Sequence, residues 1–266
     1  MMHLFYKYQG TGNDFILADN RNGEFDLLTT ELIHSLCDRH FGIGADGLML
    51  LQQKEGFDFE MKYFNADGRE GSMCGNGGRC ITLFAYHCGI IKDTYHFIAS
   101  DGPHDAIIRP DGTIALKMKD VNGLQRHKED FILDTGSPHL IRFVNNLAQE
   151  EVVSKGRSIR FSKEFAAEGI NVNFVEHQED KENIQVRTYE RGVEDETLSC
   201  GTGVTAAALV CYHHENGFNN VEVATKGGRL QVEYERVGEN QYRNIWLCGP
   251  ARKVFSATLD LKIFTP

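Results

Sequence analysis

The sequence contains no Cys-x-x-Cys pair, no run of lysine and arginine, and no stretch of 18 apolar residues. The first absence argues against a zinc ribbon and against a thioredoxin-type redox site. The second makes nucleic acid a poor partner, because phosphates are bound by basic surfaces and this chain has a net charge of −10. The third argues against a helix that spans a membrane.

The composition is that of a soluble globular protein. The 266 residues are 41% hydrophobic and 25% charged, and the chain is long enough for two domains. Glycine contributes 27 residues, which indicates many tight turns and close backbone approaches. The N-terminal segment lacks the apolar core and cleavage site of a signal peptide, so we expect a cytoplasmic protein whose seven cysteines stay reduced.

A degenerate internal repeat is the most informative feature of the sequence. Cys74 and Cys200 are each followed by Gly-x-Gly, and each has a tyrosine eleven residues before it, Tyr63 and Tyr189. Downstream of both cysteines, apolar residues recur at the spacing of one helix face. A glycine follows each cysteine after 28 residues, and a Thr-Gly pair precedes each by a similar distance. We interpret these matches as a duplication.

The repeat predicts an α+β protein of two pseudo-symmetric lobes, each with strands wrapped around a central helix that begins at the cysteine. We expect an N-terminal lobe over residues 1–119, to which residues 253–266 return, and a C-terminal lobe over 120–252. Gly89 and Gly217 are expected to terminate the two central helices. A further helix from Glu31 to Phe41, capped by Thr29 or Thr30, is expected in the first lobe alone.

A cysteine at the start of a helix is suited to acid–base chemistry. The unpaired N–H groups and the positive end of the helix dipole stabilise a thiolate, and the same groups bind a carboxylate. Two such helix ends on opposite faces of one carbon would invert a stereocentre. The alternative is that both are buried small apolar residues, the usual fate of a free cysteine. We interpret Cys88 and Cys211 in that way, because their spacing places them on the core-facing side of the helices.

Two glycine-rich segments imitate nucleotide-binding loops. Gly42-Ile-Gly44-Ala-Asp-Gly47 has the Gly-x-Gly-x-x-Gly spacing, but a helix precedes it and a strand follows, the reverse of the dinucleotide motif. Gly201-Thr-Gly203-Val-Thr-Ala206 is followed by a helix, so a phosphate cradle stays open as the weaker alternative to the acid–base site. The adjacent His213 and His214 are expected to be solvated rather than to bind a metal.

The chain resembles the diaminopimelate epimerase family over essentially its whole length. The motifs that carry the resemblance are Gly10-Thr-Gly-Asn-Asp-Phe15, Arg39-His-Phe-Gly-Ile-Gly-Ala-Asp-Gly47, Phe64-Asn-Ala-Asp-Gly68 leading into Met73-Cys-Gly-Asn-Gly-Gly-Arg-Cys80, and Tyr189-Glu-Arg-Gly192 followed by Cys200-Gly-Thr-Gly203. The paired cysteine signatures are highly specific.

The resemblance implies an enzyme that interconverts LL- and meso-diaminopimelate for lysine and peptidoglycan synthesis without pyridoxal phosphate or any other cofactor and without a metal. It implies an active site in the cleft between the lobes, with Cys74 and Cys200 as acid and base, and a homodimer. The charge and the lack of a long apolar run predict that the protein binds neither nucleic acid nor membrane. The residues implied to bind substrate are Asn13, Asn65, Gly75, Asn76, Asn171, Glu190, Arg191, Gly201 and Thr202, supported by Ser137 and His139.

Two departures from the family pattern concern the site. Ser137 stands where the family usually has an asparagine before Pro-His, and Gly47 stands where some members have glutamine. Either change could alter specificity. The sequence therefore leaves two alternatives open: a proline or hydroxyproline racemase-epimerase of the same superfamily, and a non-catalytic protein of this fold that binds a small ligand.

Overall fold

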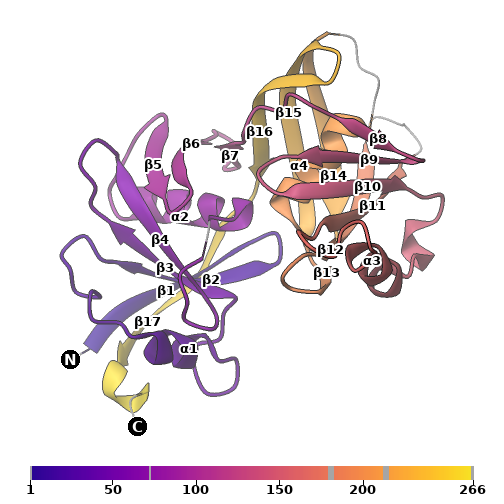
Figure 1. Ribbon diagram of the computed structural model, residues 1–266. Helices are drawn as coiled ribbons and strands as arrows, with labels where there is room; N and C mark the ends of the chain where they lie inside the picture. Colours follow the sequence, from indigo (N-terminus) through magenta and orange to yellow (C-terminus); the bar gives the residue numbers. More distant parts are fainter. Residues whose placement is uncertain (1, 72, 179–182, 212–215, 265–266) are drawn as a thin grey trace. The chain divides into compact units, whose positions relative to one another are not determined.

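The structure is a computed structural model that describes residues 2–71, 73–178, 183–211 and 216–264 (Figure 1). The chain divides into two compact units, Met1–Leu116 with Pro250–Pro266, and Lys117–Gly249. Each unit combines β-strands with α-helices. His213 and His214 lie outside the described residues. No helix in the described part of the chain is both long and apolar enough to cross a membrane.

The first unit is a twisted sheet whose strands follow the order β17-β1-β2-β3-β4-β5-β6-β7. The pairs β2–β3 and β4–β5 are parallel and the others are antiparallel. Its elements are β1 (Met2–Gly10), β2 (Asn13–Asp19), α1 (Thr30–Cys37), β3 (Gly47–Gln52), β4 (Phe59–Asn65), α2 (Gly75–His87), β5 (Tyr95–Ala99), β6 (Gly102–Ile108), β7 (Ile114–Lys117), β17 (Arg252–Asp260) and the 3₁₀ turn η2 (Leu261–Phe264).

The second unit has the same plan, in the strand order β8-β9-β10-β11-β12-β14-β15-β16, with parallel pairs at β10–β11 and β12–β14. Its elements are β8 (Gln125–His127), β9 (Asp130–Asp134), β10 (Pro138–Phe143), η1 (Leu147–Gln149), α3 (Val152–Arg160), β11 (Asn171–His177), β12 (Ile184–Glu190), β13 (Asp195–Thr197), α4 (Gly201–Val210), β14 (Gly217–Thr225), β15 (Gly228–Gly238) and β16 (Gln241–Gly249). The matched order and direction of the strands confirm the repeat.

Each unit is built around one buried helix. Helix α4 contacts strands β9, β10, β11, β12, β14, β15 and β16 of its own unit, and eight of its residues are buried. Helix α2 contacts β1, β2, β3, β6 and β17, and its apolar residues Ile81, Phe84 and Ala85 are buried. The expected central helices are therefore confirmed, and each begins directly after its cysteine.

The glycines 28 residues after the cysteines close equivalent hairpins. Gly102 begins β6 opposite Ala99, and Gly228 begins β15 opposite Thr225, both with positive φ. Gly89 ends α2 as expected, because its N–H and that of Ile90 donate to carbonyls of the last helical turn. The expectation for Gly217 is wrong, since this residue begins β14 rather than following α4.

A helix connects the first pair of parallel strands in both units, α1 between β2 and β3 and α3 between β10 and β11. In the first, Thr29 caps α1, but the helix ends at Cys37 rather than at Phe41, because the carboxylate of Asp38 accepts the N–H groups of His40 and Phe41. The prediction that this helix belongs to the first lobe alone is wrong: α3 occupies the same place in the second unit. Helix α3 is polar and contains Gly156, so its sequence does not show the apolar periodicity of a helix.

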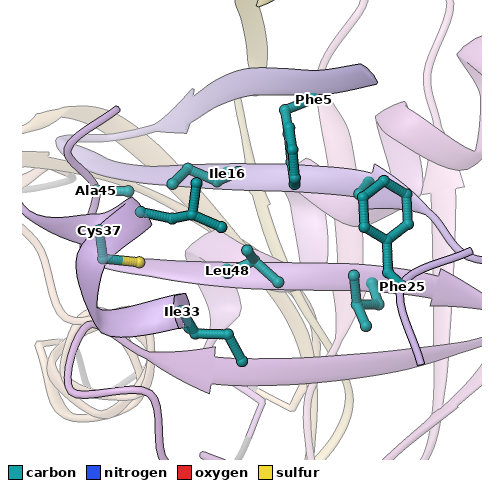
Figure 2. Close-up of a cluster of buried hydrophobic side chains, with 10 residues drawn as sticks. Phe5, Ile16, Phe25, Ile33, Cys37, Ala45 and Leu48 are labelled. Carbon is teal, nitrogen blue, oxygen red and sulfur yellow. The ribbon is translucent and has the colours of Figure 1, made fainter. Parts of the chain in front are cut away.

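These outer helices cover an apolar layer on their sheets. In the first unit, α1 packs on strands β1 to β3, and Figure 2 shows Ile33 and Cys37 of the helix facing Ile16 and Leu48 of the sheet. In the second unit, α3 packs so closely that a Cβ at Gly156 would overlap the Cβ of Tyr189. The central helices contact some of the same strands as the outer helices. The first sheet therefore packs against α1 and α2, and the second against α3 and α4.

Candidate active site

Cys74 is the N-cap residue of α2. Its backbone is extended (φ −111°, ψ 150°), and its sulfur accepts the N–H of Gly77 at 3.2 Å, in the way that a serine or aspartate caps a helix. The side chain is half-buried. The helix geometry directs the N–H groups of Gly75 and Asn76 toward the same end, where they are suited to bind a carboxylate beside the thiol.

A network of amides and charges lies behind Cys74. Asn76 is buried, and its Nδ2 donates to Asn13 Oδ1 at 2.6 Å. Its Oδ1 accepts from Thr11 Oγ1 at 2.9 Å and from Arg79 Nη2 at 2.7 Å. Asn13 in turn donates to Asp46 Oδ2 at 2.8 Å. The structure therefore brings Asn13 and Asn76 together, and protein partners fix the orientation of both amides.

Two ionised groups secure this network from opposite ends. The guanidinium of Arg79 is fully buried and donates to Thr11 Oγ1 at 2.7 Å, which places a positive charge near the first turn of α2. Arg39 holds Asp46 at 2.8 Å and Asp14 at 2.6 Å. Burial raises the pKa of Asp14, but hydrogen bonds and charges from Arg39 and Lys7 outweigh burial, so the pKa is lowered.

Two further residues of this half are Gly47, which departs from the family pattern, and Asn65, which was predicted to bind substrate. Gly47 begins β3, and a Cβ there would overlap the carbonyl oxygen of Phe64 and the ring of Tyr63, so the close approach of β4 accounts for the glycine. Asn65 is the exposed last residue of β4, and its backbone closes the turn to Gly68 and Arg69.

Cys200 is the N-cap residue of α4, with extended backbone (φ −116°, ψ 110°), and it is 8% exposed. Its sulfur lies 3.5 Å from the hydroxyl of Thr202. The carbonyl of Thr202 accepts a hydrogen bond from Thr135 Oγ1 at 2.8 Å. Thr11 and Thr135, from the equivalent Thr-Gly turns, thus each bind the second residue of the helix, Thr11 through the Asn76 side chain and Thr135 through the Thr202 carbonyl.

His139 lies directly beneath this helix end and is fully buried. Its Nε2 is 2.9 Å from Thr202 Oγ1, and its Nδ1 is 3.1 Å from the amide nitrogen of Asn173. Burial, together with the positive charge of Arg191, lowers the pKa of His139 to about 3. The imidazole is therefore neutral at physiological pH, and it lies next to Thr202, one of the predicted substrate-binding residues.

Ser137, Asn171 and Arg191 form one hydrogen-bonded group. Asn171 donates from Nδ2 to Ser137 Oγ at 2.9 Å and to Pro138 O at 3.0 Å, and its Oδ1 accepts the N–H of Arg191 at 2.9 Å. Arg191 Nη2 also donates to Ser137 Oγ at 3.3 Å, and Nη1 donates to Glu168 O at 2.9 Å. Asn171 thus positions the Arg191 backbone, while Ser137 helps to orient the guanidinium.

Glu190 and Gly201 complete the predicted set for the second half. Glu190 is the half-buried last residue of β12, directly before Arg191, and Gly201 is the buried first residue of α4. Pattern analysis missed Thr11, Arg79 and Asn173. Arg79 stands within the recognised Cys-Gly-Asn-Gly-Gly-Arg signature, and Asn173 lies two residues after Asn171 on the same strand. Both positions could therefore have been singled out from the sequence.

Several of the other cysteines are buried in ways that disfavour a thiolate. Burial raises the pKa values of the Cys80 and Cys211 thiols, and that of Cys37 to about 12. The expectation for Cys88 needs correction: it is the half-buried residue that caps the end of α2 rather than a core-facing helical residue. In the described part of the chain, no three His, Cys, Asp or Glu side chains lie close enough to hold a metal ion.

Known proteins are similar to this chain along nearly its whole length. The sequence profile of the diaminopimelate epimerase family matches residues 5–123 and 131–254. A diaminopimelate epimerase from Flavobacterium psychrophilum is 48% identical over 96% of this chain and 99% of its own length. The chain belongs to the diaminopimelate epimerase family. A second family member, from Chlorobaculum tepidum, is 44% identical over 95% of this chain and 99% of its own. The protein is therefore an isomerase that epimerises an amino acid.

Solved structures share the fold of this diaminopimelate epimerase family member at low sequence identity. A PhzF-family phenazine biosynthesis protein from Bacillus anthracis superimposes with a TM-score of 0.74 at 17% identity, covering 98% of this chain and 99% of that chain. A hydroxyproline epimerase from Agrobacterium vitis gives 0.68 at 14% identity, covering 97% and 91%. These likenesses establish the α+β fold of two similar lobes and carry no information on substrate.

Proposed function

We propose that this enzyme interconverts LL- and meso-diaminopimelate with Cys74 and Cys200 as the acid–base pair, and that it needs no pyridoxal phosphate or metal. The observation that supports this proposal best is the matched placement of the two cysteines. Each caps the N-terminus of a buried helix, and each has a sulfur within reach of a hydrogen-bond donor of its own helix, Gly77 N–H or the Thr202 hydroxyl.

The chemistry follows from what a helix end offers. One thiolate removes the α-proton and becomes a thiol, while the other thiol gives its proton to the opposite face of the carbon and becomes a thiolate. Negative charge moves from the α-carbon onto the substrate carboxylate during this step. We propose that backbone N–H groups of Gly75, Asn76, Gly201 and Thr202 bind that carboxylate and stabilise the added charge.

We propose that the remaining polar residues bind the distal amino-acid end of the substrate. Arg191 is suited to a second carboxylate, because a guanidinium pairs with it through two parallel hydrogen bonds. Asn171 and Ser137 hold Arg191 by its N–H and by Nη2. Asn13, Asn65 and Glu190 supply further groups for the distal ammonium and carboxylate. Proline and hydroxyproline have no charged second end, so they would leave these groups without a ligand.

The proposal extends to the cellular setting. We propose that the enzyme serves lysine and peptidoglycan synthesis in the cytoplasm as a homodimer. Met2 and Leu4 of β1 and Val254 and Phe255 of the neighbouring β17 are exposed apolar side chains, which supports a subunit interface on these strands. Sedimentation equilibrium should give twice the mass of the chain, and a monomer at micromolar concentration would rule out the dimer.

The substrate assignment is tested by incubating the reduced enzyme with LL-diaminopimelate, L-proline and trans-4-hydroxy-L-proline in D₂O. We expect meso-diaminopimelate carrying deuterium at one α-carbon, and no exchange in either imino acid. Cys74→Ala and Cys200→Ala should abolish the reaction, while Cys88→Ala, which changes a thiol outside the site, should retain it. Turnover of proline or hydroxyproline instead would keep the mechanism and reassign the substrate.

A further inference from the structure

A continuous chain of hydrogen bonds runs beneath the N-terminus of α4 and ends at Cys200. Asn173 Nδ2 lies 3.1 Å from His139 Nδ1, His139 Nε2 lies 2.9 Å from Thr202 Oγ1, and Thr202 Oγ1 lies 3.5 Å from Cys200 Sγ. Asn173 and His139 are fully buried. Because water has no access to these two side chains, protein partners alone set the direction of the hydrogen bond between them.

The hydrogen bonds of Asn173, at the end of the series farthest from Cys200, show which atoms donate and which accept. The second hydrogen of Asn173 Nδ2 is donated to the carbonyl of Leu140 at 3.1 Å, and Asn173 Oδ1 accepts from Thr188 Oγ1 at 2.9 Å. Reversing the amide would place its oxygen against the Leu140 carbonyl, so the nitrogen must face His139. His139 Nδ1 is then an acceptor, and the single proton of the neutral ring resides on Nε2.

With the ring proton on Nε2, His139 donates to the oxygen of the Thr202 hydroxyl. The hydrogen of that hydroxyl is then available to the Cys200 sulfur, 3.5 Å away. We propose that Asn173 and His139 act as positioning residues that hold the Thr202 hydroxyl in one orientation, as a hydrogen-bond donor to Cys200. The inference rests on the proposed function only for the statement that this sulfur takes part in catalysis.

This arrangement gives His139 a different task from that of a general base. A protonated ring would direct Nδ1–H at the amide hydrogens of Asn173, which the geometry opposes. The neutral state is also favoured by burial and by the charge of Arg191, which lower the pKa of the ring. His139 therefore keeps its proton throughout turnover, and the hydroxyl of Thr202 stabilises the thiolate form of Cys200 each time it appears.

The surroundings of the central helix differ between the two units at the glycine three residues after the cysteine. A Cβ at Gly203 of α4 would overlap Asn173 Oδ1 and lie 3.3 Å from His139 Cε1, so this glycine makes room for the chain. In α2, the glycine three residues after the cysteine is Gly77, and a Cβ there would meet the methyl ends of Met49 and Met61 at 3.5 and 3.4 Å. The Cys74 sulfur accepts a hydrogen bond from the backbone N–H of Gly77, whereas the Cys200 sulfur lies next to the side-chain hydroxyl of Thr202.

The ring proton can be located directly by NMR of protein labelled with ¹⁵N at histidine, with His139→Gln used to assign the signal. We expect the neutral Nε2–H form of His139 at every pH from 5 to 9. A neutral Nδ1–H form, or a ring that titrates within this range, would overturn the proposal. Neither result depends on the enzyme having the proposed activity.

The effect on the sulfur is measured by the pH dependence of iodoacetamide alkylation, with Cys200 and Cys74 followed separately by peptide mass spectrometry. Thr202→Val should raise the midpoint for Cys200 by about one pH unit, which is roughly a tenfold loss of thiolate below the midpoint. Thr202→Ser keeps the hydroxyl and should restore the midpoint. Cys74 in the same molecules is the internal control and should not move.

The role of Asn173 is tested by a double-mutant cycle. Asn173→Leu should raise the Cys200 midpoint when Thr202 is present and add nothing in the Thr202→Val background, because it acts through that hydroxyl. Circular dichroism and the unchanged Cys74 midpoint establish that the variants are folded. Additive shifts, or a Thr202→Val midpoint equal to that of the wild type, would contradict the proposed chain.

Discussion

Replacing Gly203 by alanine tests the packing beneath Cys200. The new Cβ would overlap Asn173 Oδ1, which must retreat by about 1 Å to reach an ordinary van der Waals separation. Asn173 is buried and bonded to His139, Leu140 and Thr188. Breaking two of these bonds costs about 2–6 kcal/mol, since each buried polar group left unsatisfied costs about 1–3 kcal/mol. Alanine regains about 1 kcal/mol of helix propensity, so we expect a net loss of about 1–5 kcal/mol.

The matched control is Gly77→Ala at the equivalent place in α2. There the new Cβ would lie 3.1 Å from Cys74 Sγ and at least 3.4 Å from the flexible ends of Met49 and Met61, which can yield. Its stability should stay within about 1 kcal/mol of the wild type. Urea unfolding midpoints at equal protein concentration give the comparison. Equal midpoints for the two alanine variants would refute the reasoning from close contact.

Three other substitutions and one cross-link have defined outcomes. Because the pKa of Asp14 is lowered in the folded state, its stabilisation is present above the ordinary value of 3.8 and lost as the pH falls below it, so Asp14→Asn should flatten the acid limb of a stability-versus-pH curve; an unchanged limb would contradict this. Arg191→Lys should raise KM for diaminopimelate about tenfold, because lysine lacks the paired donors, and an unaltered KM would remove Arg191 from the binding site. Thr29→Ala should cost about 1 kcal/mol in thermal unfolding through loss of the α1 cap, and no loss would mean that the cap is dispensable. Protein with a Cys74–Cys200 disulfide confirmed by mass spectrometry should be inactive until reduced, and full activity in that state would rule out the thiol pair.

The sequence predicts those parts of the fold that depend on local pattern. The cysteine-initiated helices α2 and α4 are visible because Cys-Gly-x-Gly is followed by apolar residues at helical spacing, and the hairpin glycines Gly102 and Gly228 mark equivalent turns. Helix α3 was missed because its stability comes from tertiary contact: Gly156, a poor helix former, is required there by the close approach of Tyr189.

The site was predictable in its residue types and less so in their tasks. Asn76 lies in a recognised motif and Asn171 is implied by the resemblance, yet their amides are bonded to protein groups, so they orient Asn13 and Arg191. The buried Arg79 and Asn173 were not singled out, since the partners that explain them lie on other elements of the chain. Which polar groups meet across a sheet or beneath a helix is decided by packing and cannot be read from spacing.

The most direct test of the two-cysteine mechanism is a brief reaction of LL-diaminopimelate in D₂O, stopped before the reverse reaction contributes. If one thiolate removes the proton and the other thiol supplies a new one from solvent, the meso product carries one deuterium at the inverted carbon and the recovered substrate carries almost none. Deuterium appearing in the recovered substrate as fast as in the product would mean that one group serves both faces, and it would contradict separate roles for Cys74 and Cys200.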